Sequence, residues 1–369
     1  MSTLFQPFTM RGHRLANRVA MAPMTRARTP DGVPGDLTAL YYGQRAGAGL
    51  IITEGTPISP SAEGFLSIPG LYTPRQIDGW RKVTDAVHGR GAVIFAQLWH
   101  VGRVSHVSIQ PGGIAPVSST SRIARNSKAW GWTADGTAGA VEVSAPRALS
   151  TGEVYGVIAD FADAAANAVR AGFDGIELHG ANGYLIEQFL NPGVNDRTDE
   201  FRGDTLAGRC RFLLETVDAV IDRIGADRTA LRLSPYGGLF DMPVYPEIGE
   251  TYLHLAEELS RRDVAYVHLM DQASRGSHSL PPAFLDAFRA RYKGVMVLAG
   301  GMTRSRAEEL IARGTIDIAA FGEPFIANPD LVDRLRNGWP LTPSNRALHY
   351  GGGAEGYTDY PVFREGDAA

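Results

Sequence analysis

Eight short apolar stretches recur along the chain, and a segment with helical periodicity follows each of them. Apolar residues fill these stretches almost without interruption, as expected of strands buried on both faces. Strands that alternate with helices predict right-handed βαβ units and a parallel sheet, and eight such units close into a barrel. The chain is therefore predicted to be an α/β protein with the (β/α)₈ TIM-barrel fold. The predicted strands are 19–23, 50–54, 92–98, 175–179, 230–234, 265–270, 295–299 and 316–321.

Three of the intervening helices carry clear start signals. Thr73 to Gln76 reads Thr-Pro-Arg-Gln and Ser150 to Glu153 reads Ser-Thr-Gly-Glu. Both runs fit the capping box, in which two side chains satisfy the first free N–H groups of a helix. Thr303 stands in the same position before a third apolar repeat. These signals support the alternation of strands and helices.

Three segments lie outside the repeat. Residues 101–149 are rich in Gly, Ser, Pro and Thr, and they are far longer than an ordinary loop after a strand. We expect this excursion after the third strand to cap an active site, with a decorative insertion as the alternative. The segment before Val19 is expected to plug the N-terminal end of the barrel. The segment after Asn337, with its Gly351-Gly352-Gly353 run, is expected to reach back over the opposite end. All 369 residues are expected to form one domain.

Composition narrows the possible partners. Hydrophobic residues make up 44% of the chain, and 36 basic against 40 acidic residues leave a net charge of −4. Neither nucleic acid nor an anionic membrane is a favoured partner of such a chain. Cys210 is the single cysteine, so a disulfide framework and a cysteine zinc site are excluded, and no metal site is expected. The N-terminus lacks the pattern of a signal peptide, and no apolar run is long enough to span a membrane, which predicts a cytoplasmic location.

Barrel enzymes place their chemistry at the C-terminal ends of the strands. Gly300 and Gly301 end the seventh predicted strand, and Gly322 ends the eighth. Glycines at these two positions allow backbone N–H groups to approach a phosphate closely, although ordinary turns would also use them. The chain has no Rossmann fingerprint and no P-loop, so a nicotinamide would have to bind as a visiting substrate.

Polar groups at other strand ends suit the edge of a heterocycle such as a flavin. Thr25 is a hydrogen-bond donor, Gln97 offers both a donor and an acceptor, and Arg232 can stabilise negative charge on a ring. A backbone N–H near Gly55 is a further donor. These groups fit several heterocycles and do not by themselves single out a flavin.

A second constellation follows the fourth strand. His179 and Asn182 can direct two donors at one oxygen, an arrangement that stabilises negative charge as it develops. Tyr184 lies two residues further on, and its phenolic proton suits general acid catalysis.

Several motifs resemble the Old Yellow Enzyme family of FMN-dependent ene-reductases. The resemblance runs from Leu4 to Pro361, and the His-x-x-Asn-x-Tyr segment followed by Asn-Asp-Arg-Thr is its most specific part. The motifs are Ala-Pro-Met-Thr-Arg at 22–26, Gln-Leu-Trp-His at 97–100, His-Gly-Ala-Asn-Gly-Tyr-Leu at 179–185, Asn-Asp-Arg-Thr-Asp at 195–199, Phe-Ile-Ala-Asn-Pro-Asp-Leu at 325–331 and Glu-Gly-Tyr-Thr-Asp-Tyr-Pro at 355–361.

The resemblance implies a role for each group of residues. His179 and Asn182 match the pair that binds the substrate oxygen, and Tyr184 matches the proton donor. Trp99 and Tyr357 match residues that line the cavity above the flavin. The implied cofactor contacts are Pro23, Met24, Thr25, Gly55, Gln97 and Arg232 for the flavin ring, and Gly300, Gly301, Gly322 and the amide of Glu323 for the phosphate.

Three positions qualify the resemblance. Thr25 stands where one branch of the family carries a redox-sensing cysteine, which places the chain in the other branch. Phe65 replaces an active-site tyrosine of many relatives and is expected to contact substrate. Glu323 replaces an arginine that reaches the FMN phosphate, so we expect its carboxylate to turn away, with Arg304 as a substitute cation.

The implied activity is ping-pong reduction of activated C=C bonds. NADH or NADPH reduces noncovalently bound FMN, and an enone, a nitroalkene or a related oxidant such as a nitrate ester or nitroaromatic then accepts the hydride. A monomer or homodimer is expected. The alternatives are a barrel hydrolase that uses two carboxylates from Glu54, Asp271 and Glu323, and a flavin-binding protein without turnover.

Overall fold

Strand pairing closes the main sheet into a barrel. The computed structural model describes residues 2–364, and the eight predicted strands are all present. Each pairs in parallel with its neighbours, and the pairing of the last strand, β15, with the first, β3, completes the circle. The predicted fold class is therefore confirmed. The barrel strands are β3 (Val19–Met21), β4 (Leu50–Ile52), β6 (Val93–Trp99), β11 (Gly175–Gly180), β12 (Thr229–Leu233), β13 (Val267–Met270), β14 (Met296–Ala299) and β15 (Ile318–Phe321).

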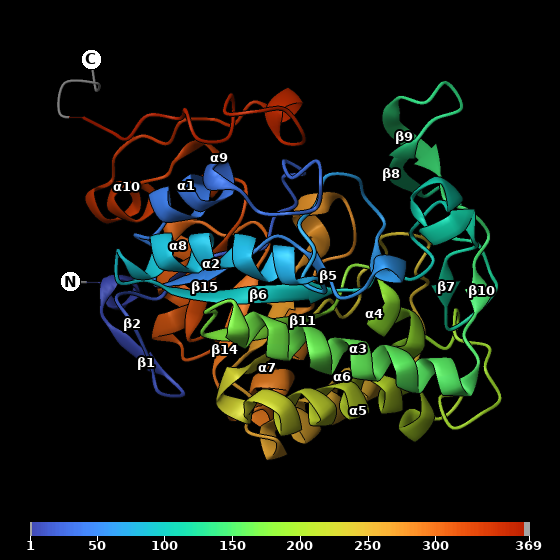
Figure 1. The fold of residues 1–369 in the computed structure, drawn as a ribbon. Coiled ribbons are helices and arrows are strands. Elements are labelled where there is room, and N and C mark those ends of the chain that lie inside the picture. The colour runs from blue at the N-terminus through green and yellow to red at the C-terminus, as the bar shows by residue number, and fades with distance from the viewer. Residues whose placement is uncertain (1, 365–369) are drawn as a thin grey trace.

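Helices surround the barrel, as Figure 1 shows. The three predicted start signals are used: Thr73, Ser150 and Thr303 each accept a hydrogen bond from a backbone N–H in the first turn of the helix that follows. The helices are α1 (Asp36–Gln44), α2 (Pro74–His88), α3 (Thr151–Arg170), α4 (Leu185–Leu190), α5 (Leu206–Ile224), α6 (Ile248–Arg261), α7 (Pro282–Arg291), α8 (Arg304–Ala312), α9 (Pro324–Ala327) and α10 (Leu331–Asn337). Within residues 2–364, none of them has the length and apolar character needed to cross a membrane.

The apolar residues of the strands divide into two layers. Successive side chains of a strand point to opposite faces, so alternate residues enter the barrel and the others face the helices. In β6, Val93 and Phe95 belong to the inner cluster, whereas Ile94, Ala96 and Leu98 pack in the outer one. This alternation explains why the strands are apolar throughout, because both faces are buried.

A hairpin closes the N-terminal end of the barrel. It consists of β1 (Phe8–Met10) and β2 (His13–Leu15), which pair antiparallel. Met10 and Leu15 are fully buried in the inner cluster, and the ring of His13 lies edge-on to Phe95. The predicted plug is therefore confirmed.

The long excursion lies at the opposite end (Figure 1). It contains β7 (Val117–Ser118), β8 (Lys128–Trp132), β9 (Ala138–Glu142) and β10 (Arg147–Ala148), and β8 and β9 form a hairpin. Five of its buried apolar residues, from Val101 to Val143, share a third cluster with Trp99 and Tyr184, two of the predicted site residues. A short extra strand, β5 (Thr56–Pro57), extends the same end of the sheet alongside β6.

The C-terminal segment returns to the end of β3, as predicted. The guanidinium of Arg26 donates to the carbonyl oxygens of His349 and Gly356 at 2.9 and 2.7 Å. Arg28 donates to those of Leu348 and Gly353 at 2.9 and 3.0 Å. Because these two arginines lie one and three residues after Thr25, they tie the last segment to the edge where the predicted site lies.

Candidate functional site

The alternation of the strands directs five polar side chains into the barrel. Residues 97, 232 and 268 have the same parity as the inner apolar residues of their own strands, and residues 177 and 179 alternate with the outward-facing Ile176 and Leu178 of β11. All five are almost fully buried near the C-terminal ends of β6, β11, β12 and β13, and strand register places His179 beside Arg232 and Arg232 beside His268. These side chains are Gln97, Glu177, His179, Arg232 and His268. Glu177 and His268 were not assigned from the sequence, although a glutamate inside an apolar strand is a visible signal.

Glu177 organises this cluster. Its two carboxylate oxygens accept hydrogen bonds from Gln97 Nε2 and His268 Nδ1, each at 2.8 Å. Burial alone raises the pKa of the Glu177 carboxyl, but the charges of His268 and Arg232 and these hydrogen bonds outweigh it and hold the pKa below its ordinary value. Because an ionised carboxylate can only accept, the amide of Gln97 must turn its NH₂ towards it. The Gln97 carbonyl oxygen is thereby turned away from Glu177.

Arg232 is a buried cation with few partners. Its Nη2 contacts Met270 Sδ at 3.2 Å, and its Nε has no hydrogen-bond partner within the described residues. Burial lowers the pKa of Arg232 to about 10, and the nearby charge of Glu177 opposes that shift. A guanidinium with an unused donor in such a place is suited to a ligand that carries or develops negative charge.

Aromatic rings frame His179. The rings of Trp99 and Tyr184 lie 6.0 and 5.1 Å from its imidazole, and Phe65 stacks on Trp99 at 5.5 Å. Burial, followed by the charge of Arg232, holds the pKa of His179 well below its ordinary value, so the imidazole is neutral. Its Nδ1 has no partner among residues 2–364. A neutral imidazole still donates one hydrogen bond, which is what an oxygen-binding role requires.

Tyr184 and Asn182 complete the predicted trio. Burial raises the pKa of the Tyr184 phenol, so Tyr184 keeps its proton at neutral pH. Asn182 has a left-handed backbone with φ of 58°, and its N–H donates to Ser234 Oγ at 2.7 Å. The structure thus brings His179, Asn182, Tyr184, Trp99 and Phe65 to one end of the barrel.

The glycines of the last two barrel strands form a cradle of free N–H groups. A Cβ on Gly300 would stand 2.0 Å from the carbonyl oxygen of Asp271, so only glycine fits there. Within the described chain, no hydrogen bond uses the backbone N–H of Gly301, Gly322 or Glu323. Arg306 donates to the carbonyl oxygen of Gly300 at 2.6 Å and so holds the turn from behind. Unused N–H groups on two adjacent turns are what a phosphate needs.

The remaining predicted cofactor contacts lie at the same edge. Pro23, Met24 and Thr25 follow β3 and are half-buried. A Cβ on Gly322 would stand 3.7 Å from Met24 Sδ, so these two strand ends are neighbours. Gly55 lies against the indole of Trp99, where a Cβ would stand only 2.2 Å from the ring.

Glu323 is exposed and turns to the C-terminal segment. Its carboxylate accepts a hydrogen bond from Ser344 Oγ at 2.9 Å. Arg304, named from the sequence as a substitute cation, pairs with Glu308 and donates to the carbonyl of Leu335 instead. The arginine that lies beside the glycine turn is Arg306, two residues further along α8.

Tyr357, which the resemblance assigns to the cavity lining, lies buried against another aromatic ring. Tyr357 is only 1% exposed, and its ring stacks on Tyr41 at 4.2 Å, beneath Arg28. Tyr350, in the same C-terminal segment, is 62% exposed.

The three carboxylates of the hydrolase alternative do not act together. Glu54 accepts from the backbone N–H groups of Arg26 and Ala27, at 3.0 and 3.3 Å, and Glu323 is bonded to Ser344. Asp271 forms an ion pair with Arg306 at 3.2 Å. Each is committed to a structural partner.

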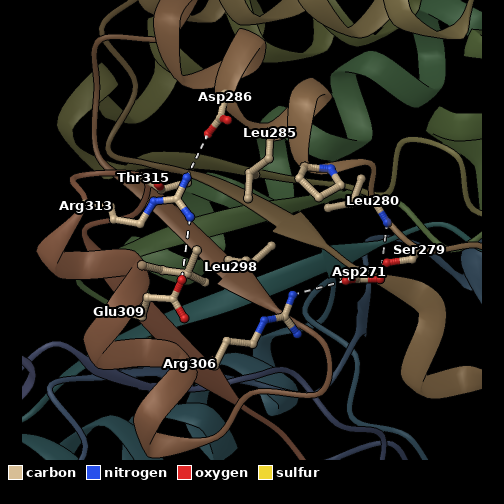
Figure 2. A pocket seen from close by; sticks show the side chains of 12 residues that line it. Asp271, Ser279, Leu280, Leu285, Asp286, Leu298, Arg306, Glu309, Arg313 and Thr315 are labelled. Carbon is tan, nitrogen blue, oxygen red and sulfur yellow. Dashed lines mark hydrogen bonds and ion pairs between the residues drawn. The ribbon is translucent and has the colours of Figure 1, made fainter.

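A cavity of about 270 Å³ lies between α7 and α8, on the helix side of β14. Figure 2 shows the side chains that line it. Its charged residues pair with one another: Arg306 with Asp271, and Arg313 with both Asp286 and Glu309. The cavity therefore backs the glycine turn from outside the barrel and is separate from the cluster around His179.

Comparison with known proteins identifies the family. Residues 3–342 match the NADH:flavin oxidoreductase / NADH oxidase family. The chain is 42% identical over 377 residues to 12-oxophytodienoate reductase 7 of Oryza sativa subsp. japonica, covering 97% of this chain and 94% of that protein. It is 40% identical over 373 residues to 12-oxophytodienoate reductase 2 of Arabidopsis thaliana, with coverage of 97% and 95%.

Solved structures agree with this match. Morphinone reductase superposes with a TM-score of 0.96 at 44% identity, covering 100% of this chain and 98% of that one. Its complex with tetrahydroNAD superposes with a TM-score of 0.94 at 45% identity, covering 99% of both chains. Together with the strand-end cluster, these matches exclude the hydrolase. The chain belongs to the NADH:flavin oxidoreductase / NADH oxidase family, as an Old Yellow Enzyme-type, NAD(P)H-dependent flavin oxidoreductase.

Proposed function

We propose that this protein holds one noncovalent FMN and uses NADH or NADPH to reduce C=C bonds activated by a carbonyl or nitro group. The observation that carries the proposal is the set of unused donors at one barrel end. Arg232 Nε and His179 Nδ1 are buried without partners in the described chain, and the glycine turns hold free N–H groups nearby in the fold. Buried polar groups without partners are costly, so such a set indicates a ligand.

The residues present fit FMN. The Gln97 carbonyl, turned outward by Glu177, would accept a ring N–H, and Arg232 would face negative charge on the ring. Thr25 and the backbone at Pro23, Met24 and Gly55 would surround the same ring. The N–H groups of Gly301, Gly322 and Glu323, with Gly300 in the turn, would hold the phosphate.

When bound, FMN supplies the redox chemistry, accepting hydride from the nicotinamide and delivering it to the activated carbon. His179 and Asn182 each donate a hydrogen bond to the carbonyl or nitro oxygen of the substrate, which stabilises the negative charge that develops there. Tyr184 gives its phenolic proton to the α-carbon. Trp99 and Phe65 pack against the substrate, and nitrate esters and nitroaromatics are further acceptors.

We also propose that residues 101–149 cap the site. Ala129 and Val143 of this segment share a buried cluster with Trp99 and Tyr184, and Trp130 forms a backbone bridge with Phe65. The cap would exclude water from the reacting atoms, which strengthens the hydrogen bonds to the substrate oxygen.

The purified protein is expected to be yellow and to release FMN into the supernatant on acid precipitation. Under anaerobic conditions, NADH or NADPH should bleach the flavin absorption, and an enone should restore it. Titration with each nicotinamide in turn gives the preference between them. A colourless protein that takes up no FMN would refute the proposal. A yellow protein that bleaches but does not recover with any enone or nitroalkene would support a binding or oxidase role instead.

Tyr184→Phe is expected to keep flavin reduction by nicotinamide and to slow enone reduction by about 10²–10⁴-fold, the usual cost of losing a general acid. Nitro acceptors that need no proton on carbon should be affected less. Stopped-flow absorption measures the two half-reactions separately. Phe240→Leu is a matched control, because it alters another ring packed on Tyr184 without removing a proton. An unchanged enone rate in Tyr184→Phe would mean that another group supplies the proton.

His179→Ala is expected to weaken the binding of phenolic inhibitors by about tenfold to a hundredfold, since a hydrogen bond to a charged oxygen contributes roughly 1.5–3 kcal/mol. The long-wavelength charge-transfer absorption of the bound phenol measures its affinity. Phenol affinity equal to that of the wild type would contradict the role of His179.

Glu323→Gln is expected to change the dissociation constant of FMN by well under about tenfold, because a carboxylate bonded to Ser344 and exposed to water is screened from the phosphate. Titration of apoprotein with FMN at low and high salt tests this. A gain of about a hundredfold or more at low salt would show that Glu323 repels the phosphate.

A further inference from the structure

One buried side chain outside the predicted trio contacts it directly. Gln272 follows β13 and is 1% exposed, and its Nε2 donates to Asn182 Oδ1 at 3.0 Å. Nothing in the sequence pattern singled it out, because residues 182 and 272 lie 90 positions apart.

The orientation of the Gln272 amide follows from a backbone group. The N–H of Gly238 is shared between two acceptors, Ser277 Oγ at 2.9 Å and Gln272 Oε1 at 3.2 Å. A backbone N–H can only donate, so the atom facing it must be the carbonyl oxygen. The NH₂ of Gln272 must then face Asn182, which has to present its own carbonyl oxygen in return.

The Asn182 amide therefore has one remaining direction for its donors. With Oδ1 held by Gln272, Nδ2 points to the other side of the amide, and it has no partner within residues 2–364. The backbone of Asn182 is held as well: its N–H donates to Ser234 Oγ, which donates in turn to the buried carboxyl of Glu187. Neither the backbone nor the amide can turn without breaking a buried hydrogen bond.

The surroundings of Gln272 leave it little freedom. A Cβ on Gly237 would stand 2.5 Å from Gln272 Cδ and Nε2, so the side chain packs directly on a glycine backbone. The backbone of Gln272 is held as well, because its own backbone carbonyl accepts from the N–H of Ser277 at 3.2 Å. The relay from Gly238 through Gln272 to Asn182 is thus rigid as well as directional.

We propose that Gln272 is a positioning residue, which fixes the Asn182 amide so that its NH₂, and not its carbonyl, faces the substrate oxygen. The proposal rests on the proposed function, because it needs Asn182 to bind that oxygen. Without the relay, an asparagine amide turns over freely and presents an acceptor, which repels an oxygen, as readily as a donor.

Two substitutions of Gln272 separate this role from simple packing. Gln272→Glu keeps the shape but replaces the NH₂ by a carboxylate oxygen, so it accepts from Asn182 Nδ2 and turns the Asn182 carbonyl to the ligand. Gln272→Leu removes the contact without imposing the wrong orientation. The probe is para-hydroxybenzaldehyde, whose phenolate oxygen stands for the substrate oxygen. Its dissociation constant from the FMN-loaded variants is measured by calorimetry and by charge-transfer absorption.

If Gln272 positions Asn182, Gln272→Glu should lose more phenol affinity than Gln272→Leu. A role in packing alone predicts the reverse order. Gln272→Glu should weaken phenol binding by about tenfold to a hundredfold, since a charge-assisted donor becomes an acceptor, and Gln272→Leu should weaken it by less than about tenfold. In an Asn182→Ala background, neither substitution should have a further effect beyond about threefold, because positions in contact are not additive. The proposal would be overturned if Gln272→Leu lost as much phenol affinity as Gln272→Glu or more. It would also be overturned if either loss were additive with that of Asn182→Ala.

The Asn182→Ala single variant distinguishes the two levels of the hypothesis. If it weakens phenol binding while Gln272→Glu does not, the role of Gln272 is refuted and that of Asn182 stands. If Asn182→Ala itself leaves phenol affinity unchanged, the proposed oxygen-binding role of Asn182 fails, and the positioning role fails with it. If Gln272→Glu does not take up FMN, Gln272→Leu is compared in the wild-type and Asn182→Ala backgrounds. A loss of phenol affinity that vanishes in the Asn182→Ala background supports the relay. An equal loss in both backgrounds overturns it.

Discussion

The site depends on a carboxylate buried inside a closed barrel. An unpaired charge at that depth would be strongly destabilising, so Glu177 has to be surrounded by donors and cations. The barrel supplies them from neighbouring strands: Gln97 from β6, Arg232 from β12 and His268 from β13. In meeting this need, the strands also orient Gln97 and place a guanidinium at the C-terminal rim. The contacts that keep Glu177 charged therefore also position Gln97 and Arg232, two of the groups that we assign to the cofactor.

Around this carboxylate, several hydrogen-bond donors have no partner within the described chain. Arg232 and His179 have buried nitrogen atoms without partners in the described chain, and the N–H groups of Gly301, Gly322 and Glu323 are unbonded. Groups arranged in advance need no reorganisation when a ligand or a transition state brings the complementary charge. The Gln272 relay extends this logic to Asn182, where a backbone N–H of Gly238 sets the direction of two successive amides.

Segments remote in sequence complete the same end of the barrel. The 101–149 excursion packs on Trp99 and Tyr184, and Arg26 and Arg28 bind the carbonyls of the C-terminal segment. Ser344 of that segment also holds the Glu323 carboxylate. The acidic side chain of Glu323 is in this way accommodated through a contact with the C-terminal segment.

Local signals in the sequence determined the eight strands, the helix starts at Thr73, Ser150 and Thr303, and the residue types at the strand ends, because period and capping depend on near neighbours. They also marked His179, Asn182 and Tyr184, which lie within six residues of one another. Only the tertiary structure decided the rest. Glu177 gains its partners through strand register, Gln272 meets Asn182 across 90 positions, Arg306 rather than Arg304 reaches the glycine turn, and Tyr357 stacks on Tyr41. Each of these contacts depends on the direction in which a side chain leaves a packed backbone, and no local pattern encodes that direction.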